Sequence, residues 1–211
     1  MINFKEIKEN RLSETFKKKG YVIIKLDDIE PLEYLRNSII KNISKICKIS
    51  HPEKNEEEYF LNNFHKNIKP IKLNEYRLKI INSINRDNNF KKNYFLSSKN
   101  VLYDLVGNEL SMQTRINLSI QTPGDRTSLL PLHSDIWSGD SPFEVVAWIP
   151  LVNCYDTKAM YILPPKYYKK VEKNFSTFSG NSSEEFFKKI KKNIEWIKIN
   201  FGEILVFNQG L

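Results

Sequence analysis

The first half of the chain carries apolar residues at helical spacing. They recur every three to four positions from Leu32 to Ile49 and again from Leu73 to Ile84, which predicts two amphipathic helices. Residues 13–19 end in lysines and precede Gly20, a composition typical of the last turns of a helix, where cations meet the negative end of the dipole. The apolar run from Tyr21 to Leu26 then predicts a strand.

The second half changes to the period of a strand. From Met112 to Ile120, apolar and polar residues alternate, which predicts a strand with one polar face. Residues 143–149 are nearly all apolar, as in a central strand that is covered on both sides. Shorter strands are expected at 160–163, at 195–201 and at 203–207, the last two joined at Gly202. Many short strands after a helical start favour a sandwich or barrel with helices packed outside it.

Two helices are expected between these strands. One begins at Pro165, because proline suits the first turn of a helix, and the other begins at Ser182, three residues before Glu185 in a capping box. No repeat, low-complexity tract or linker divides the chain, so we expect one domain over residues 1–211. Within it, residues 1–110 form a mainly helical support and residues 111–211 a β-rich core.

Composition narrows the class of protein only moderately. The 211 residues are 40% hydrophobic, which is enough for one sizeable core. Cys47 and Cys154 lie far apart and match no metal or redox spacing, and no apolar run is long enough to span a bilayer, so we expect a cytoplasmic protein without a disulfide framework. The net charge of +8 comes from scattered lysines, which favours a solvated surface over a nucleic-acid partner and leaves a weak attraction for acidic substrates or sugar phosphates.

One short stretch of the β-rich half could bind a metal ion. It runs Pro131-Leu132-His133-Ser134-Asp135-Ile136-Trp137. If it is extended, His133 and Asp135 project from the same face, so that an imidazole and a carboxylate can converge on one ion. Two histidines and one carboxylate form the facial triad that holds Fe(II) in non-haem oxygenases, and this pair supplies two of the three ligands. The triplet alone is more often structural, because His-x-Asp arises by chance in many proteins.

A resemblance to a known family adds to this interpretation. The stretch from His133 through Trp148 to Leu163 resembles the phytanoyl-CoA-hydroxylase-like branch of the Fe(II)/2-oxoglutarate-dependent oxygenases, in which a His-x-Asp pair precedes a loop, an apolar strand with a tryptophan and a Leu-Pro segment. The opening at residues 16–24, a helix that ends at glycine and leads into a strand, is similar as well. Within the superfamily, the chain looks most like the oxygenases of bacterial surface-carbohydrate gene clusters.

This resemblance implies a fold and a site. The fold is α+β, a double-stranded β-helix (jelly roll) braced by N-terminal helices, with its last strands missing. His133 and Asp135 become the catalytic iron ligands, and Trp148 lies beside 2-oxoglutarate, although it is as readily a plain core residue. The polar face of the strand at 112–120 and its end offer further residues that contact the cosubstrate or substrate if they line a pocket, and that face water otherwise: Arg115, Asn117 and Gln121.

The chain departs from the family pattern near its end. Residues 202–208 resemble the strand that leads, in the family, into the second histidine ligand and then into a basic residue that grips 2-oxoglutarate; here both would lie beyond Leu211. His51 and His65 are expected on the surface and do not replace the missing ligand. The chain is therefore interpreted as C-terminally incomplete, with a degenerate homologue as the alternative. Residues 164–167, Pro-Pro-Lys-Tyr, also stand where relatives often have a Gly-Ser-His turn.

The resemblance implies an Fe(II)/2-oxoglutarate-dependent dioxygenase that hydroxylates a small polar metabolite, such as a sugar or nucleotide-sugar in surface-carbohydrate biosynthesis. Fe(II) and 2-oxoglutarate are the implied cofactor and cosubstrate, and no nucleic acid or membrane span is expected. One alternative is a catalytically inactive jelly roll that binds a carbohydrate or a protein partner. Another is a metal-dependent cupin of different chemistry, such as an isomerase, but the His-x-His typical of cupins is absent around His133.

Overall fold

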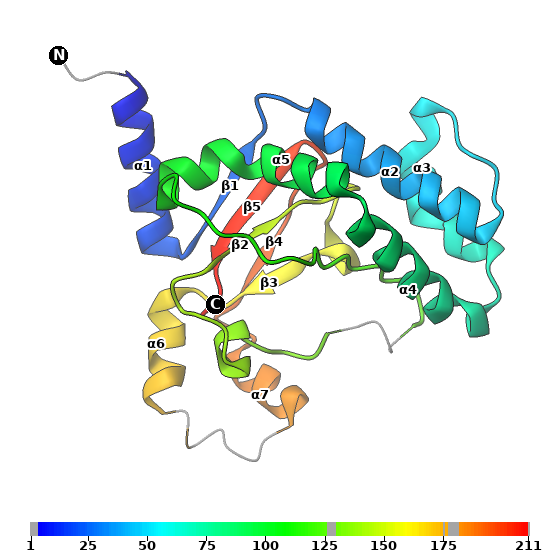
Figure 1. The fold of residues 1–211 in the computed structure, drawn as a ribbon. Helices are drawn as coiled ribbons and strands as arrows, with labels where there is room; N and C mark the ends of the chain where they lie inside the picture. Colours follow the sequence, from blue (N-terminus) through cyan, green and yellow to red (C-terminus); the bar gives the residue numbers. More distant parts are fainter. Residues whose placement is uncertain (1–3, 126–129, 175, 177–181, 211) are drawn as a thin grey trace.

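The computed structural model describes residues 4–125, 130–174, 176 and 182–210. Helices and strands alternate irregularly along the chain (Figure 1). The helices are α1 (Phe4–Lys19), α2 (Glu30–Cys47), α3 (Glu57–Asn63), α4 (Pro70–Arg86), α5 (Asn88–Val106), α6 (Pro165–Lys173) and α7 (Ser183–Ile190). The strands are β1 (Tyr21–Lys25), β2 (Val145–Trp148), β3 (Met160–Ile162), β4 (Glu195–Ile197) and β5 (Glu203–Asn208). Short 3-10 turns are η1 (Lys54–Glu56), η2 (Phe64–Asn67), η4 (Asp135–Ser138) and η5 (Asp156–Lys158).

The centre of the molecule is a three-stranded antiparallel sheet in the order β1-β5-β2. In its register Val22 lies opposite Val206, and Trp148 lies opposite Leu205. Strand β5 is flanked on both sides, and its residues Ile204, Leu205 and Val206 are fully buried. The apolar run at 143–149 does form a strand, but β2 lies at the edge of the described sheet and not at its centre. Its apolar character reflects packing on both faces of the sheet, which says nothing about its place in the strand order.

Different layers cover the two faces of this sheet. One face carries Val22, Ile204 and Val206 and packs against α5 at Val101, with α1 contributing Leu12 and Phe16. The other face packs against the two-stranded antiparallel sheet β3-β4, through a cluster formed by Cys154, Ile162, Ile197, Ile199 and Leu205, with Trp148 and Phe207 at its border. The described residues therefore form an α+β fold with two small antiparallel sheets and no closed barrel.

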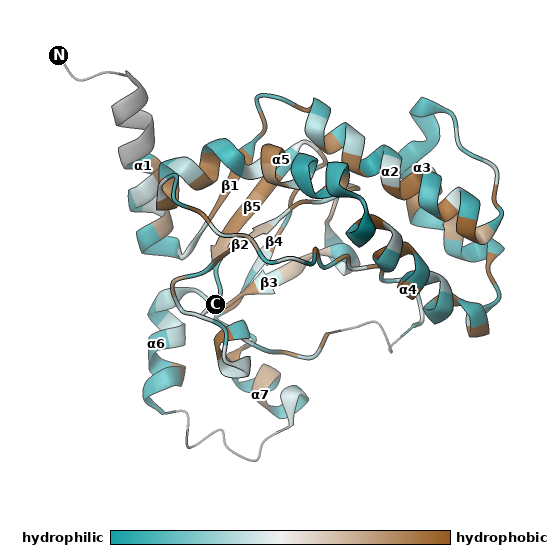
Figure 2. Ribbon diagram, in the orientation of Figure 1, coloured by the Kyte–Doolittle hydropathy of each residue, from teal (hydrophilic) through white to brown (hydrophobic). Residues whose placement is uncertain are grey.

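A second core lies among the helices. The apolar stripe of α2 packs against α4 and α5, and its members include Leu32, Leu35, Ile39, Ile40 and Ile43. Figure 2 shows hydrophobic colouring along β1 and β5 and mostly hydrophilic colouring on the outer turns of the helices. Among the described residues, no helix is both long and apolar enough to cross a bilayer.

Most of the expected elements are confirmed. Helix α1 ends directly before Gly20, which adopts a left-handed φ of 77°. Helices α2 and α4 cover the two periodic stretches, and α6 begins at Pro165. Helix α7 has the full capping box, because the Ser182 hydroxyl accepts from the Glu185 backbone while the Glu185 carboxylate accepts from the Ser182 backbone.

The predicted strand at Met112–Ile120 is wrong. This stretch contains no strand, and its backbone bonds to side chains of α4 in place of a neighbouring strand. Asn85 accepts from the backbone N–H of Ile116 at 2.7 Å and donates to its carbonyl at 3.0 Å, while Arg77 donates to the carbonyl of Ile120 at 2.8 Å. The helix side chains thus satisfy backbone groups that a strand would satisfy through a ladder.

Candidate metal site

The His133–Asp135 pair lies where an extended backbone meets a 3-10 turn. Ser134 has extended angles (φ −128°, ψ 134°), and Asp135 begins η4, which is followed by the capping residue Gly139 with a left-handed φ of 100°. The backbone is thus extended through Ser134 and turns from Asp135 onward. Nε2 of His133 lies 3.4 Å from Oδ1 of Asp135, so the two side chains meet in space.

A hydrogen bond fixes the orientation of the His133 ring. Nδ1 lies 2.7 Å from the carbonyl oxygen of Pro131. A carbonyl can only accept, so Nδ1 carries the proton in this bond and Nε2 of the neutral ring keeps its lone pair. A bond of this kind from the second ring nitrogen is the usual way in which proteins orient a histidine that binds metal.

With Nδ1 as the donor to Pro131, this pair can present two acceptor atoms to one cation. With Nδ1 protonated, neutral Nε2 and carboxylate Oδ1 are both acceptors, and two acceptors at 3.4 Å repel each other unless a proton or a metal ion lies between them. Two donor atoms bound at about 2.1 Å to one ion lie about 3.0 to 3.4 Å apart, for angles between 90° and tetrahedral. The side chains of His133 and Asp135 are 46% and 34% exposed, so an ion can reach them from solvent.

The end of β5 lies directly beside this pair. The hydroxyl of buried Ser134 donates to the carbonyl of Gln209 at 2.8 Å, and Gly210 approaches Ile136. On the other side of the turn, the rings of Trp137 and Phe186 of α7 pack with their centroids 5.7 Å apart. Figure 1 shows this arrangement, with the end of the red strand next to the short green turn that precedes β2.

No third protein ligand joins the pair within the described part of the chain, where no group of three or more His, Cys, Asp or Glu side chains could hold a metal. His51 is exposed, and its Nδ1 contacts the carbonyl of Pro52 at 2.9 Å. His65 lies half-buried in η2 beside Phe64, and its pKa is lowered by burial and by Lys66. The structure thus brings together the two side chains that were predicted as iron ligands, without a third among the described residues.

The other predicted site residues lie in two different places. Trp148 packs at the border of the cluster between the two sheets, opposite Leu205. Arg115 is exposed and donates to Asn82 of α4 at 3.3 Å. Asn117 and Gln121 are exposed in the same irregular segment. The contact of these four residues with a cosubstrate therefore stays a prediction.

Two further residues, Gln209 and Glu144, are linked to this pair through Ser134 and were missed from the sequence. Gln209 is only 9% exposed, and its amide nitrogen donates to the carboxylate of Glu144 at 2.9 Å. Its amide oxygen is buried and has no hydrogen-bond partner among the described residues. The available signal was a polar Asn-Gln pair placed directly after the apolar strand at 203–207, since buried amides usually have a structural or binding role.

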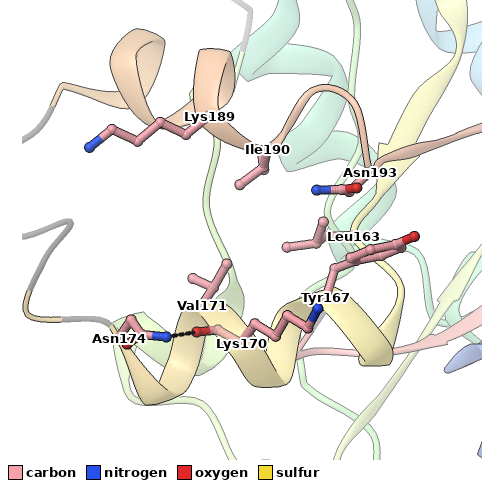
Figure 3. A pocket seen from close by; sticks show the side chains of 8 residues that line it. All are labelled: Leu163, Tyr167, Lys170, Val171, Asn174, Lys189, Ile190 and Asn193. Atoms are coloured by element: carbon pink, nitrogen blue, oxygen red, sulfur yellow. Dashed lines mark hydrogen bonds between the residues drawn. The ribbon is translucent and has the colours of Figure 1, made fainter.

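The structure also has a hollow away from this pair. It lies between α6 and α7, has a volume of about 360 Å³, and is shown in Figure 3. Its floor is apolar and its rim carries two lysines and two asparagines: Leu163, Tyr167, Lys170, Val171, Asn174, Lys189, Ile190 and Asn193 line it. Neither His133 nor Asp135 contributes to it.

Comparison with known proteins adds no relative. A scan against protein-family models finds no match, and searches of curated proteins and of solved structures find no significant match. The candidate site described here, a histidine and a carboxylate 3.4 Å apart in an α+β fold, therefore rests on the chain's own geometry.

Proposed function

We propose that the protein is a non-haem Fe(II)/2-oxoglutarate-dependent dioxygenase in which His133 and Asp135 hold the iron. The observation that supports it is the pair of acceptors, Nε2 and Oδ1, 3.4 Å apart, with the ring fixed by the carbonyl of Pro131. One nitrogen and one carboxylate oxygen are ligands that Fe(II) accepts in facial triads. The proposed substrate is a small polar metabolite or sugar derivative, and the proposed compartment is the cytoplasm, in keeping with the two free cysteines Cys47 and Cys154.

The residues present fit two positions of an iron site. Bound iron with 2-oxoglutarate would supply the oxidising chemistry. His133 would bind through neutral Nε2 while Nδ1 keeps its proton on Pro131, and Asp135 would bind as a carboxylate. Because protons compete for both groups, metal affinity should fall in acid. No third protein ligand joins the pair among the described residues.

The arrangement of the sheets supports the jelly-roll part of the proposal. The sheets β1-β5-β2 and β3-β4 face each other across an apolar cluster, as the two halves of a double-stranded β-helix do. Trp148 points into this cluster, and the His133–Asp135 pair lies at the end of β5. The helices α1 and α5 cover the opposite face of the first sheet, where we propose that they brace it.

A second candidate function is a jelly-roll protein that binds a carbohydrate or a protein partner without catalysis. The described residues favour it in one respect, because they contain no complete set of three metal ligands. In that case a proton, and not a metal ion, would lie between His133 and Asp135.

Iron binding and turnover discriminate the two candidates. The protein is titrated with Fe(II) under anaerobic conditions and then incubated with 2-oxoglutarate and air, with succinate as the readout. We expect His133→Ala and Asp135→Ala each to weaken Fe(II) binding at least tenfold. His51→Ala is the matched control, because His51 also contacts a carbonyl through Nδ1 but lies away from Asp135. Equal Fe(II) affinity in all four proteins would contradict the proposal and favour the second candidate, whereas Fe(II) binding without succinate would contradict the oxygenase activity alone.

A further inference from the structure

Ser134 is the buried member of the His-Ser-Asp triplet. It is 4% exposed, whereas the two side chains that flank it are open to solvent. Its hydroxyl donates to the carbonyl of Gln209, a residue 75 positions further along the chain, at 2.8 Å. The residue between the two candidate ligands could equally well be exposed. The burial of Ser134 and its long-range hydrogen bond therefore need an explanation of their own.

The bond determines which way the two neighbours face. Side chains alternate along an extended backbone, and Ser134 is extended. When its hydroxyl is held inward against the end of β5, the side chains of His133 and Asp135 must project outward on the opposite side. A rotation of this segment would turn both candidate ligands together.

The acceptor of this bond is itself held by strand β2. Val145 pairs with Asn208 at the end of the β2–β5 ladder, and the next step is made by side chains, because the Gln209 amide donates to the Glu144 carboxylate at 2.9 Å. Asn208 closes the turn by accepting from the backbone N–H of Gly210 at 2.7 Å. The Gln209 carbonyl therefore sits in a frame fixed by the sheet.

We propose that Ser134 is a positioning residue that couples the metal ligands to the central sheet through Gln209 and Glu144. This inference rests on the proposed function, since it assigns Ser134 a role through the ligands and not a contact with substrate. Removing the hydroxyl leaves the Gln209 carbonyl without this donor and frees the triplet to rotate. Residues that orient metal ligands typically change affinity by about 10- to 100-fold when they are removed.

Mn(II) is the probe for this proposal, because it accepts the same nitrogen and oxygen ligands and its free form is counted directly by electron paramagnetic resonance. Ser134→Ala should bind Mn(II) about tenfold more weakly than the unaltered protein. Ser134→Thr keeps a hydroxyl, and threonine is well suited to an extended backbone, so its affinity should return to within about threefold of the starting value.

Ser97→Ala is the matched control. Ser97 is equally buried, at 6% exposed, but its hydroxyl donates to Asn93 within its own helix α5. Ser97→Ala should lower the free energy of unfolding, measured in urea, about as much as Ser134→Ala does. It should leave the Mn(II) affinity unchanged. Equal Mn(II) affinity for Ser134→Ala and the unaltered protein would overturn the positioning role alone, as would equal weakening in Ser97→Ala. If the unaltered protein binds Mn(II) no better than Asp135→Ala does, the metal site itself is wrong and both proposals fall.

Discussion

The core and the site segment of this protein are held together in different ways. The core comprises the sheet β1-β5-β2 with helices α2, α4 and α5, and its backbone bonds lie within helices and between strands. The site segment, residues 107–125 and 130–140, contains no strand and only the turn η4. Its backbone is held by side chains that reach it from elsewhere, such as Asn85 and Arg77. Stability of the core should therefore depend on apolar volume, and that of the segment on a few polar side chains.

The largest effect is expected in the core. Ile40 of α2 is fully buried among the helices, so Ile40→Ala removes apolar contacts and leaves a cavity. We expect a loss of about 4 kcal/mol in the free energy of unfolding, measured by urea denaturation. Ile71→Ala is the control, because Ile71 is 87% exposed in α4, and it should change stability by less than about 0.5 kcal/mol. A loss below about 1 kcal/mol for Ile40→Ala would show that the helical core is packed differently.

The next largest effect is expected where Arg77 anchors the site segment. This buried guanidinium contacts the Asp125 carboxylate at 2.6 Å and donates to the Ile120 carbonyl. Arg77→Met should cost about 3 kcal/mol in urea denaturation, because it leaves the largely buried carboxylate of Asp125, 18% exposed, without its cation and the Ile120 carbonyl without its donor. Arg86→Met, at an exposed position of the same helix, should cost less than about 0.5 kcal/mol. Similar losses in the two variants would contradict the anchoring role of Arg77.

A smaller loss of stability is expected from a change of Asn85. The side-chain amide of Asn85 makes the hydrogen bonds to the Ile116 backbone that a neighbouring strand would make. Asn85→Ala removes both bonds to the Ile116 backbone and should cost about 2 kcal/mol. The more specific readout is hydrogen exchange of the Ile116 amide, which should accelerate at least tenfold. Asn93→Ala is matched, because the Asn93 amide donates only to Asn89 within its own helix. If exchange at Ile116 stays slow in Asn85→Ala, the segment is held by other contacts.

The smallest effect concerns Tyr94, which joins α5 to the sheet. Its hydroxyl donates to the Ala147 carbonyl of β2 at 2.5 Å, and burial raises the pKa of Tyr94 to about 12. The folded protein thus keeps this proton at pH values where the unfolded chain loses it, so stability should fall as pH rises from about 10 to about 12. Tyr94→Phe should lower the free energy of unfolding by about 1 kcal/mol at pH 7. In urea denaturation, the free energy of unfolding of this variant should fall less between about pH 10 and about pH 12 than that of the unaltered protein. An unchanged slope would contradict the assignment.

Local periodicity predicted the core well and the site segment poorly. The stripe of α2 and the apolar strand β5 follow from spacing alone, because their burial repeats with the period of the element. The alternation of apolar and polar residues at Met112–Ile120 is as regular as the patterns of α2 and β5. Ile116 is indeed buried, yet Met112 is 43% exposed and no strand forms. Whether a segment pairs with a strand or with Asn85 depends on the tertiary partner, which the local pattern does not contain.

The site was predicted in part for the same reason. The proximity of His133 and Asp135 follows from their spacing, and the structure places Nε2 and Oδ1 3.4 Å apart. The residues that hold them, Ser134 and Gln209, were not predicted, because their bond crosses 75 positions of the chain. The proposed function comes from the resemblance to a family, because the residues alone leave it open.

The most direct test is whether His133 and Asp135 share one metal ion. The chain has only three histidines, so nuclear magnetic resonance of the imidazole nitrogens gives one set of signals each for His51, His65 and His133. With substoichiometric Mn(II), the His133 signals should broaden while those of His51 and His65 stay sharp, and Asp135→Asn should remove this selectivity. Equal broadening of all three histidines, or selective broadening of His133 that persists unchanged in Asp135→Asn, would contradict the shared site.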